Sequence, residues 1–274
     1  MQNFLDKSGG VTLISGPCAL ESYENAVSIA SKMKAITEKL GIRYYFKASV
    51  DKANRTSAHH YRGLGFEEGL AVLAAVKKDA AVSVVTDIHE PWQAERAAQV
   101  ADMIQIPAFL CRQTDLLRAA AETGKPLNIK KAQFMSPEEM GKVAEKVVSL
   151  GGDKIILCER GNAFGYNSLV VDMTGLVRLQ KLGYPVAFDA THSTQISGGG
   201  VHTSNSGAAE FAPHLAKAAM ATGAVDVLFI ETHQEPASAL CDGSCMVKLS
   251  DMEEILEKCV QIFKIVRSLS HACP

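Results

Sequence analysis

Three basic side chains lie within one short stretch of the sequence, together with two hydroxyls and an amide. The stretch follows an apolar run of β type, Tyr44–Phe46, and ends at Ser57. Its polar members are Lys47, Lys52, Asn54, Arg55, Thr56 and Ser57. Arginine binds phosphate through a planar fork of donors, lysine supplies a mobile charge, and amides and hydroxyls bind sugar hydroxyls. The stretch predicts a site for an anionic, hydroxylated small molecule, although an isolated loop of this kind is more often a solvated turn.

Eight short apolar runs alternate with eight amphipathic patterns along the chain. We predict strands at Val11–Ser15, Tyr44–Ala48, Val82–Asp87, Met103–Ile106, Leu127–Lys130, Lys154–Cys158, Val186–Asp189 and Val227–Glu231. We predict helices at Tyr23–Leu40, Phe66–Lys77, Trp92–Val100, Asp115–Glu122, Pro137–Ser149, Gly175–Leu182, Phe211–Thr222 and Asp251–Leu269. Strands that are apolar on both faces, each followed by a helix, indicate a parallel sheet covered on both sides. Eight such units favour one catalytic domain over residues 1–274, a (β/α)8 TIM barrel, over an open doubly wound sheet.

The composition is that of an ordinary globular protein, with 47% hydrophobic and 21% charged residues. The formal net charge of −2 provides no overall field for nucleic acid or an anionic membrane, so we expect neither as a partner. The first seven residues lack the apolar core of a signal peptide, and no apolar run approaches the roughly 20 residues that span a bilayer. Seven scattered cysteines are typical of reduced thiols. We therefore expect a cytoplasmic protein.

In a (β/α)8 barrel, the side chains at the carboxyl ends of the strands surround one active site. The groups at the predicted ends are Cys18, Lys47 with Lys52, Asp87, Gln105, Lys130, Arg160, His192 and Glu231. Every end carries a group that can bind a ligand, coordinate a metal or transfer a proton. This coincidence indicates an enzyme.

The cations at these ends have no comparable block of carboxylates to neutralise them. They are Lys47, Lys52, Arg55, Lys130 and Arg160. Converging cations are unfavourable unless a ligand supplies anions, and a phosphate carries at most two charges, so we expect ligands with more than one anionic group. Crowding should also lower the pKa values of the three lysines before a substrate binds.

A second set of residues offers metal ligands. A thiolate, an imidazole and two carboxylates suit a divalent transition metal, and the chain offers them at Cys18, His192, Glu231 and Asp242. No short metal motif supports the set, because only a barrel would bring Cys18, His192 and Glu231 together. Asp242 lies in the loop after the eighth strand. This loop would have to fold back over the mouth, the opening of the barrel at the carboxyl ends of its strands. A buried structural cysteine beside unrelated polar loops fits the same spacing equally well.

The segment from Lys47 to Ser57 resembles that of the 3-deoxy-D-manno-octulosonate 8-phosphate synthases. Further matching segments cover nearly the whole chain, at residues 16–18, 86–91, 105–110, 130–134, 159–161, 164–167, 188–192 and 231–233. The Lys-Ala-Asn-Arg form at residues 52–55 separates this family from the related heptulosonate-phosphate synthases, which carry a Lys-Pro-Arg type of sequence there. The resemblance implies a transferase that condenses phosphoenolpyruvate with D-arabinose 5-phosphate and releases phosphate, in the synthesis of lipopolysaccharide precursors.

The resemblance also implies roles for single residues. Those matching phosphoenolpyruvate ligands are Lys47, Gln105, Lys130 and Arg160, with the backbone N–H of Ala108 near the phosphate. Those matching pentose-phosphate contacts are Asn54, Arg55 and Asp87, with Thr56 keeping a hydroxyl where serine is frequent and Lys52 between the two substrates. Lys52, Asp87, Lys130 and His192 are the residues we expect to take part in the chemistry.

Members of the family form homotetramers, in which the arginine matching Arg55 reaches a neighbouring subunit's site. Metal-dependent members have cysteine at the Cys18 position and metal-independent ones asparagine, so the resemblance implies a divalent metal (Mn²⁺, Fe²⁺, Co²⁺ or Zn²⁺) held by Cys18, His192, Glu231 and Asp242. The sequence leaves open whether the metal activates water or only positions groups. One departure is the stretch at residues 206–210, where many members carry Gly-Gly-Arg, and it leaves the closing of a lid after strand seven open.

Three other functions fit parts of the pattern. A related enzyme that uses erythrose 4-phosphate would share the barrel and the phosphoenolpyruvate site. An aldolase that forms a Schiff base would use Lys130 as its amine. A barrel that senses sugar phosphates without catalysis would need only the cations.

Overall fold

The computed structural model describes Leu5, residues 10–53, Arg55, and residues 57–164, 168–196 and 209–270. Two of the predicted site residues, Asn54 and Thr56, lie outside this part of the chain. So does most of the loop after the seventh predicted strand, residues 197–208. This range includes the first three residues of the stretch 206–210, which differs from the family pattern.

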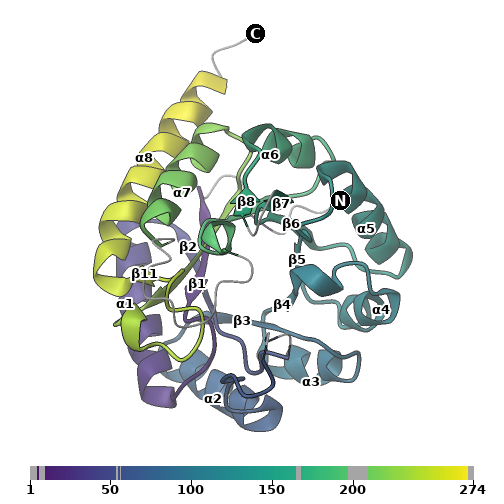
Figure 1. Cartoon of the computed structure of the whole chain (residues 1–274), viewed down its shortest axis with the longest axis vertical. Coiled ribbons are helices and arrows are strands. Elements are labelled where there is room, and N and C mark those ends of the chain that lie inside the picture. The colour runs from purple at the N-terminus through teal and green to yellow at the C-terminus, as the bar shows by residue number, and fades with distance from the viewer. Residues whose placement is uncertain are drawn as a thin grey trace.

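Eight parallel strands close into a barrel (Figure 1). They are β1 (Thr12–Gly16), β2 (Arg43–Lys47), β3 (Ser83–Asp87), β4 (Met103–Ile106), β5 (Leu127–Lys130), β6 (Ile155–Glu159), β9 (Val186–Asp189) and β10 (Val227–His233). Each strand pairs with the next in this order, and β1 pairs with β10 to complete the circle. The predicted barrel is thereby confirmed, and it is not an open sheet.

The helices form a ring outside the strands (Figure 1). They are α1 (Tyr23–Leu40), α2 (Phe66–Asp79), α3 (Gln93–Val100), α4 (Thr114–Glu122), α5 (Pro137–Ser149), α6 (Met173–Gln180), α7 (Ala212–Ala221) and α8 (Met252–Ser270). Their ends follow local chemistry, as at α5, where Ser136 and Glu139 form a capping box. None of the described helices is long and apolar enough to cross a membrane.

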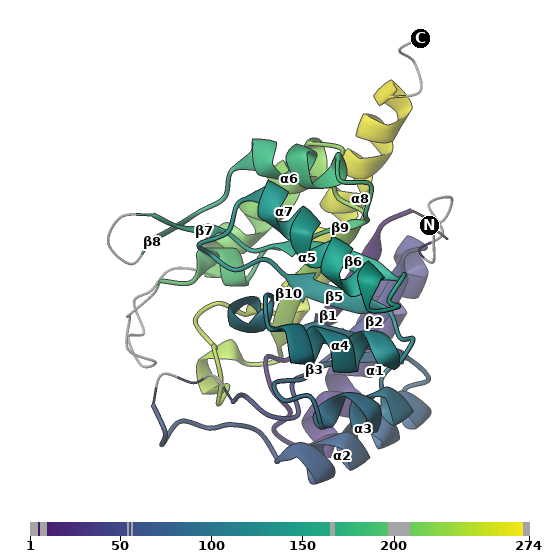
Figure 2. The ribbon, with the colours of Figure 1, turned by 90° about the vertical axis from the view of Figure 1, so that its right-hand side faces the viewer.

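Three strands were not predicted. Strands β7 (Asn162–Phe164) and β8 (Ser168–Val170) pair antiparallel after β6, and Figure 2 shows them projecting from one end of the barrel. Strand β11 (Val247–Lys248) pairs with the end of β10. These strands have only two or three residues each, too short for a periodic pattern in the sequence.

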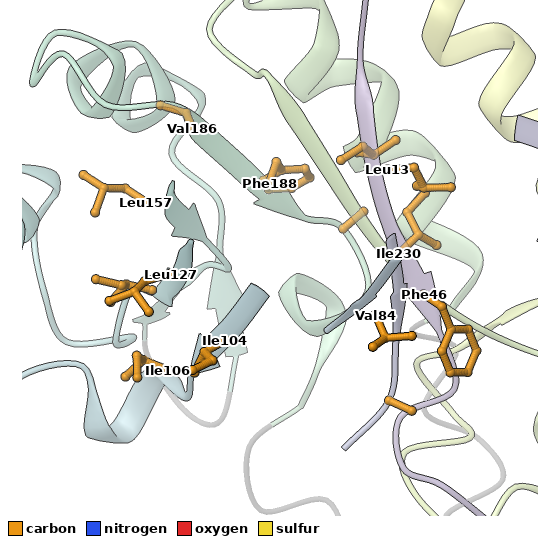
Figure 3. Close-up of a cluster of buried hydrophobic side chains, with 14 of the residues drawn as sticks. Leu13, Phe46, Val84, Ile104, Ile106, Leu127, Leu157, Val186, Phe188 and Ile230 are labelled. Carbon is orange, nitrogen blue, oxygen red and sulfur yellow. The ribbon is translucent and has the colours of Figure 1, made fainter. Parts of the chain in front are cut away.

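Alternate residues of each barrel strand face two different cores. One set packs against the helices, as with Leu13, Val84 and Ile104 (Figure 3). The neighbouring positions, among them Ile14, Val85, Met103, Ile156 and Phe229, fill the barrel interior. At the carboxyl ends of the strands this inward set changes from apolar to polar, and there the candidate site begins.

Candidate active site

The inward positions at the carboxyl ends of the strands carry buried charges. The charged ones are Lys47, Asp87, Lys130, Asp189 and Glu231, the neutral Gln105 lies among them, and all six are at most 5% exposed. Strand register places them on one rim, since Asp87 lies opposite Gln105 and Glu231 lies opposite Gly16, two residues before Cys18. The predicted convergence is therefore present in the structure.

Lys47 and Glu231 form a buried ion pair across the barrel. The Nζ atom of Lys47 lies 2.9 Å from Oε1 of Glu231, and both side chains are 1% exposed. Lys47 also donates to the carbonyl oxygen of Cys18 and to Oγ of Ser49, each at 3.1 Å. With three acceptors, the ammonium group of Lys47 is held in place before any substrate binds.

The carboxylate of Asp189 links Lys130 to His192. Its Oδ2 atom accepts from Nζ of Lys130 and lies 2.7 Å from Nδ1 of His192. Its Oδ1 atom accepts from Oγ1 of Thr191 at 3.0 Å and from the backbone N of His192 at 2.9 Å. Burial opposes the charge of Asp189, but the charges of His192 and Lys130 prevail and hold its pKa well below the usual value. Because Asp189 faces Nδ1, the other ring nitrogen of His192 points into the mouth.

That second nitrogen, Nε2, faces two carboxylates. It lies 3.6 Å from Oε2 of Glu231 and 4.0 Å from Oδ2 of Asp242. Among the described residues, Oε2 of Glu231 has no hydrogen-bond partner although it is buried. Burial opposes the charge of Glu231, yet His192 and Lys47 lower its pKa, so the carboxylate is ionised. A buried carboxylate oxygen with nothing to bind is a position that a cation would satisfy.

Cys18 completes the cluster from the other side. Its Sγ atom lies 2.9 Å from Sγ of Cys241 and 3.4 Å from Oδ2 of Asp242. Burial, Cys241 and the negative charge of Asp242 raise the pKa of the Cys18 thiol well above its usual value. Asp242 has a positive φ of 49°, a strained conformation for a residue other than glycine. Burial opposes its charge, but Lys52, His192 and Arg55 lower its pKa to about 2.

These donors fit a divalent metal. Cys18, Cys241 and Asp242 form one group whose ligand atoms lie within 4.8 Å of one another, and His192, Glu231 and Asp242 form a second. Asp242 belongs to both, so the four predicted ligands lie together, with Cys241 as an additional donor. Asp189 behind His192 and Lys47 behind Glu231 are the outer partners that orient such ligands. The unpartnered oxygen of Glu231 supports the fit, and a cation would also favour the thiolate of Cys18.

The remaining cations surround this cluster. Arg55 donates from Nη1 to Oδ1 of Asp242 and to Sγ of Cys241, both at 3.1 Å. Arg160 donates to Oε1 of Gln195, whose Nε2 donates to Oδ2 of Asp242 at 3.3 Å. Arg55 thus contacts Asp242 directly, and Arg160 is connected to it through Gln195.

Two further predicted ligands lie on the opposite side of the rim. Gln105 accepts from Nδ2 of Asn128 at 3.0 Å, which fixes its amide. Ala108 begins a short 3-10 turn, Ala108–Leu110, whose own bonds run from Leu110 to Pro107 and from Cys111 to Ala108. The backbone N–H of Ala108 takes no part in those bonds and lies just beyond the end of β4.

Two expectations from the sequence are wrong. The mouth does contain a block of carboxylates, namely Asp87, Asp189, Glu231 and Asp242, and all four are buried or largely buried. The pKa of Lys52 is raised, not lowered: burial opposes its charge, but the neighbouring acidic groups, Cys18, Glu231, Cys241 and Asp87, outweigh burial. The sequence was misleading because it shows which strand ends carry cations but not which carboxylates pair with those cations in the fold.

Sequence reasoning did not assign Asp189, Gln195 or Cys241 to the site. Asp189 had a usable signal, since it is the last residue of a predicted strand and faces the same way as Ala187 in the barrel interior. Cys241 and Gln195 lie in loops, where the sequence does not indicate which way a side chain points. Arg160 is oriented by a buried neighbour, because Oε1 of Glu159 accepts from the backbone N of Arg160 at 2.9 Å.

A parallel (β/α)8 barrel with buried cations and a thiol, imidazole and carboxylate cluster at its carboxyl-end mouth has the architecture of a barrel enzyme. The chain belongs to the DAHP synthetase I family, whose sequence pattern matches residues 7–268.

Proteins named 2-dehydro-3-deoxyphosphooctonate aldolase are similar over most of the chain. The one from Fusobacterium nucleatum is 51% identical over 257 residues, which is 94% of this chain and 92% of the relative. The one from Desulfotalea psychrophila is 52% identical over 250 residues, covering 91% of this chain and 89% of the relative. The one from Bordetella petrii is 50% identical over 261 residues, covering 93% and 91%. The resemblance found in the sequence segments is confirmed.

Proposed function

We propose that this chain condenses phosphoenolpyruvate with D-arabinose 5-phosphate and water to give 3-deoxy-D-manno-octulosonate 8-phosphate and inorganic phosphate, in lipopolysaccharide precursor synthesis. The observation that carries the proposal is identity of half the residues, over nine-tenths of the chain, to relatives named 2-dehydro-3-deoxyphosphooctonate aldolase. The mouth supports it, because its buried cations suit two substrates that each carry a phosphate.

Phosphoenolpyruvate would lie on the deep side of the mouth. Lys47, Lys130 and Arg160 would bind its carboxylate and phosphate, with Gln105 and the N–H of Ala108 as neutral donors. Lys47 and Lys130 are already bonded to Glu231 and Asp189, so both ammonium groups are fixed in position and desolvated before a substrate binds. Such preorganised charges act where negative charge changes during the reaction.

Arabinose 5-phosphate would lie nearer the solvent. Asn54, Arg55 and Thr56 would bind its phosphate and hydroxyls, with Asp87 accepting from a sugar hydroxyl. Burial opposes the charge of Asp87, but Lys47 and Lys52 lower its pKa, so it is an acceptor at neutral pH. Arg55 would have to exchange its contact with Asp242 for the phosphate or, in a homotetramer, for a neighbouring subunit's site.

The condensation joins C3 of phosphoenolpyruvate to the aldehyde carbon of the sugar. Lys52 would lie between the two substrates, where its charge offsets their repulsion and stabilises the oxygen anion that develops from the aldehyde. Water adds at C2, and the bond between C2 and the bridging oxygen of the phosphate group then breaks, which releases inorganic phosphate. His192 and Lys130, which both contact Asp189, would hold or move protons at this end of the site.

The metal ligands in this proposal are Cys18, His192, Glu231 and Asp242, for Mn²⁺, Fe²⁺, Co²⁺ or Zn²⁺. A metal bound there would orient the aldehyde or lower the pKa of a bound water. We also propose that residues 1–274 form one catalytic domain, that the protein is cytoplasmic, and that it assembles as a homotetramer.

Release of phosphate from phosphoenolpyruvate, measured with and without arabinose 5-phosphate and with and without a chelator, tests the proposal. We expect release only with the pentose phosphate and a loss with the chelator. Preference for erythrose 4-phosphate would identify the related heptulosonate activity, and an adduct trapped on Lys130 by borohydride would identify a Schiff base. Absence of release with either sugar would favour a barrel that only binds sugar phosphates.

A further inference from the structure

A partly exposed carboxylate outside the mouth connects three of the segments that carry the proposed metal ligands. Glu21 lies three residues after Cys18, just before Ser22, the N-cap of α1, and its side chain is 15% exposed. Its Oε1 atom accepts from the backbone N of Leu240 at 2.8 Å. Its Oε2 atom accepts from Nδ2 of Asn25 at 3.3 Å and lies 3.4 Å from Nε2 of His233. None of these contacts has a role in the proposed reaction.

The contact with Leu240 bears on Asp242. Leu240 directly precedes Cys241 and Asp242, yet its own side chain is 50% exposed, so burial of that side chain does little to hold the segment. The chain must then turn so that Asp242 adopts a positive φ of 49°. A strained residue of this kind persists only where its surroundings hold it. The bond to Glu21 fixes the chain two residues before that turn.

The contact with His233 bears on Glu231, which lies two residues earlier on β10. The Nδ1 atom of His233 accepts from the backbone N of Glu235 at 3.1 Å, while Nε2 lies 2.8 Å from Nδ2 of Asn25 and 3.4 Å from Oε2 of Glu21, so these neighbours together hold the ring. Burial opposes the charge of Glu21, but His233 and the N–H of Leu240 lower its pKa. The carboxylate is therefore ionised, and hydrogen bonds to an ionised acceptor are about twice as strong as neutral ones.

We propose that Glu21 is a positioning residue for the metal centre, which sets the place of Asp242 relative to Cys18 and Glu231. The inference rests on the proposed metal site and adds a residue that touches none of the ligands. Cys18 and Asp242 belong to opposite ends of the chain, and Glu21 joins the loop after β1 to the loop after β10 where the two ligands meet. Without it, the segment entering Cys241 and Asp242 would lose its backbone hydrogen bond to the loop that carries Cys18 and would keep the contacts of Cys18 Sγ with Cys241 and Asp242.

The test is Co²⁺ binding by metal-free protein, followed by the absorption band that a thiolate ligand gives to Co²⁺. Removing an outer partner of a metal site lowers affinity about 10- to 100-fold. We expect Glu21→Ala to weaken Co²⁺ binding by at least about tenfold and to alter the thiolate band. Glu21→Gln should lie between this variant and the wild type, because an amide oxygen still accepts from Leu240 while its NH₂ group faces Asn25 and His233. Glu24→Ala is the matched control, since Glu24 is exposed on the first turn of α1.

Thermal unfolding of the metal-free proteins separates positioning from folding. We expect the melting temperature of Glu21→Gln to stay near that of the Glu24→Ala control while its Co²⁺ affinity falls. Wild-type affinity and spectrum in folded Glu21→Ala would overturn the inference. So would a loss of Co²⁺ affinity in both Glu21 variants that only follows the loss of metal-free stability. A wild-type protein that binds Co²⁺ without a thiolate band would refute the proposed metal site itself, whatever the Glu21 variants do.

Discussion

Replacement of Asp189 by asparagine tests how the mouth is held together. The carboxylate of Asp189 faces four donors, because Oδ2 contacts Lys130 and His192 Nδ1 while Oδ1 accepts from Thr191 and the backbone N of His192. An amide has one oxygen and one NH₂ group. In either orientation, therefore, two of the four donors would face an N–H. The substitution keeps the shape of the side chain and removes both the charge and half of the acceptors.

The magnitude follows from burial. Asp189 is fully buried and the side chain of Lys130 is 6% exposed, so Asp189→Asn leaves a buried ammonium without its partner. Breaking a buried ion pair in this way costs about 3–5 kcal/mol of unfolding free energy. His192 also loses the acceptor that faces its Nδ1 atom, and loss of such a partner lowers metal affinity about 10- to 100-fold. Both effects should appear together at neutral pH.

The assays are urea unfolding and metal competition, with Asp153→Asn as a control at an exposed aspartate. The pH dependence has a definite sign. The pKa of Asp189 is depressed in the folded protein, so its stabilisation is present above the usual aspartate pKa of about 3.9 and is lost as the pH falls through the folded value. The stability difference between wild type and variant should hold from pH 8 to about 5 and shrink below about 4. A difference under about 1 kcal/mol at pH 7.5, with metal affinity unchanged, would refute the reasoning.

Four further substitutions probe the proposed ligands, Arg55 and the loop of Asp242. Cys18→Asn should retain some phosphate release that a chelator no longer affects, whereas His192→Ala should not recover phosphate release. Full activity of wild-type enzyme shown to be metal-free by elemental analysis would contradict this prediction. Arg55→Lys should raise the KM for arabinose 5-phosphate about ten- to hundredfold in steady-state assays and leave that for phosphoenolpyruvate nearly unchanged, because a point charge cannot reproduce the planar fork; equal changes in both would speak against the assignment. Gly243→Ala places a Cβ 2.1 Å from the carbonyl oxygen of Pro236, so the Asp242 turn must shift. Calorimetric titration should then show weaker metal binding, with little change in the fold by circular dichroism. Unaltered metal affinity would show that the position of the turn does not matter for binding.

The sequence by itself determined the barrel and most of its rim. Each of the eight predicted barrel strands is present, with ends displaced by two residues at most, because apolar runs and helix periods are local signals. Strand ends such as Lys47 and Lys130 then had to meet, since parallel strands of a closed barrel end on one face. Unpredicted β7, β8 and β11 are too short to carry such a signal.

Only the tertiary structure decided which charges meet. Lys130 binds Asp189 across 59 positions of sequence and Lys47 binds Glu231 across 184, so neither pairing nor the raised pKa of Lys52 follows from local patterns. The place of Asp242 depends on a loop that turns back onto the loop after β1 and is bonded there through Leu240 and Glu21. Loop direction is set by such distant contacts and not by residue type, which is why the sequence offered Asp242 as a candidate ligand and left its position open.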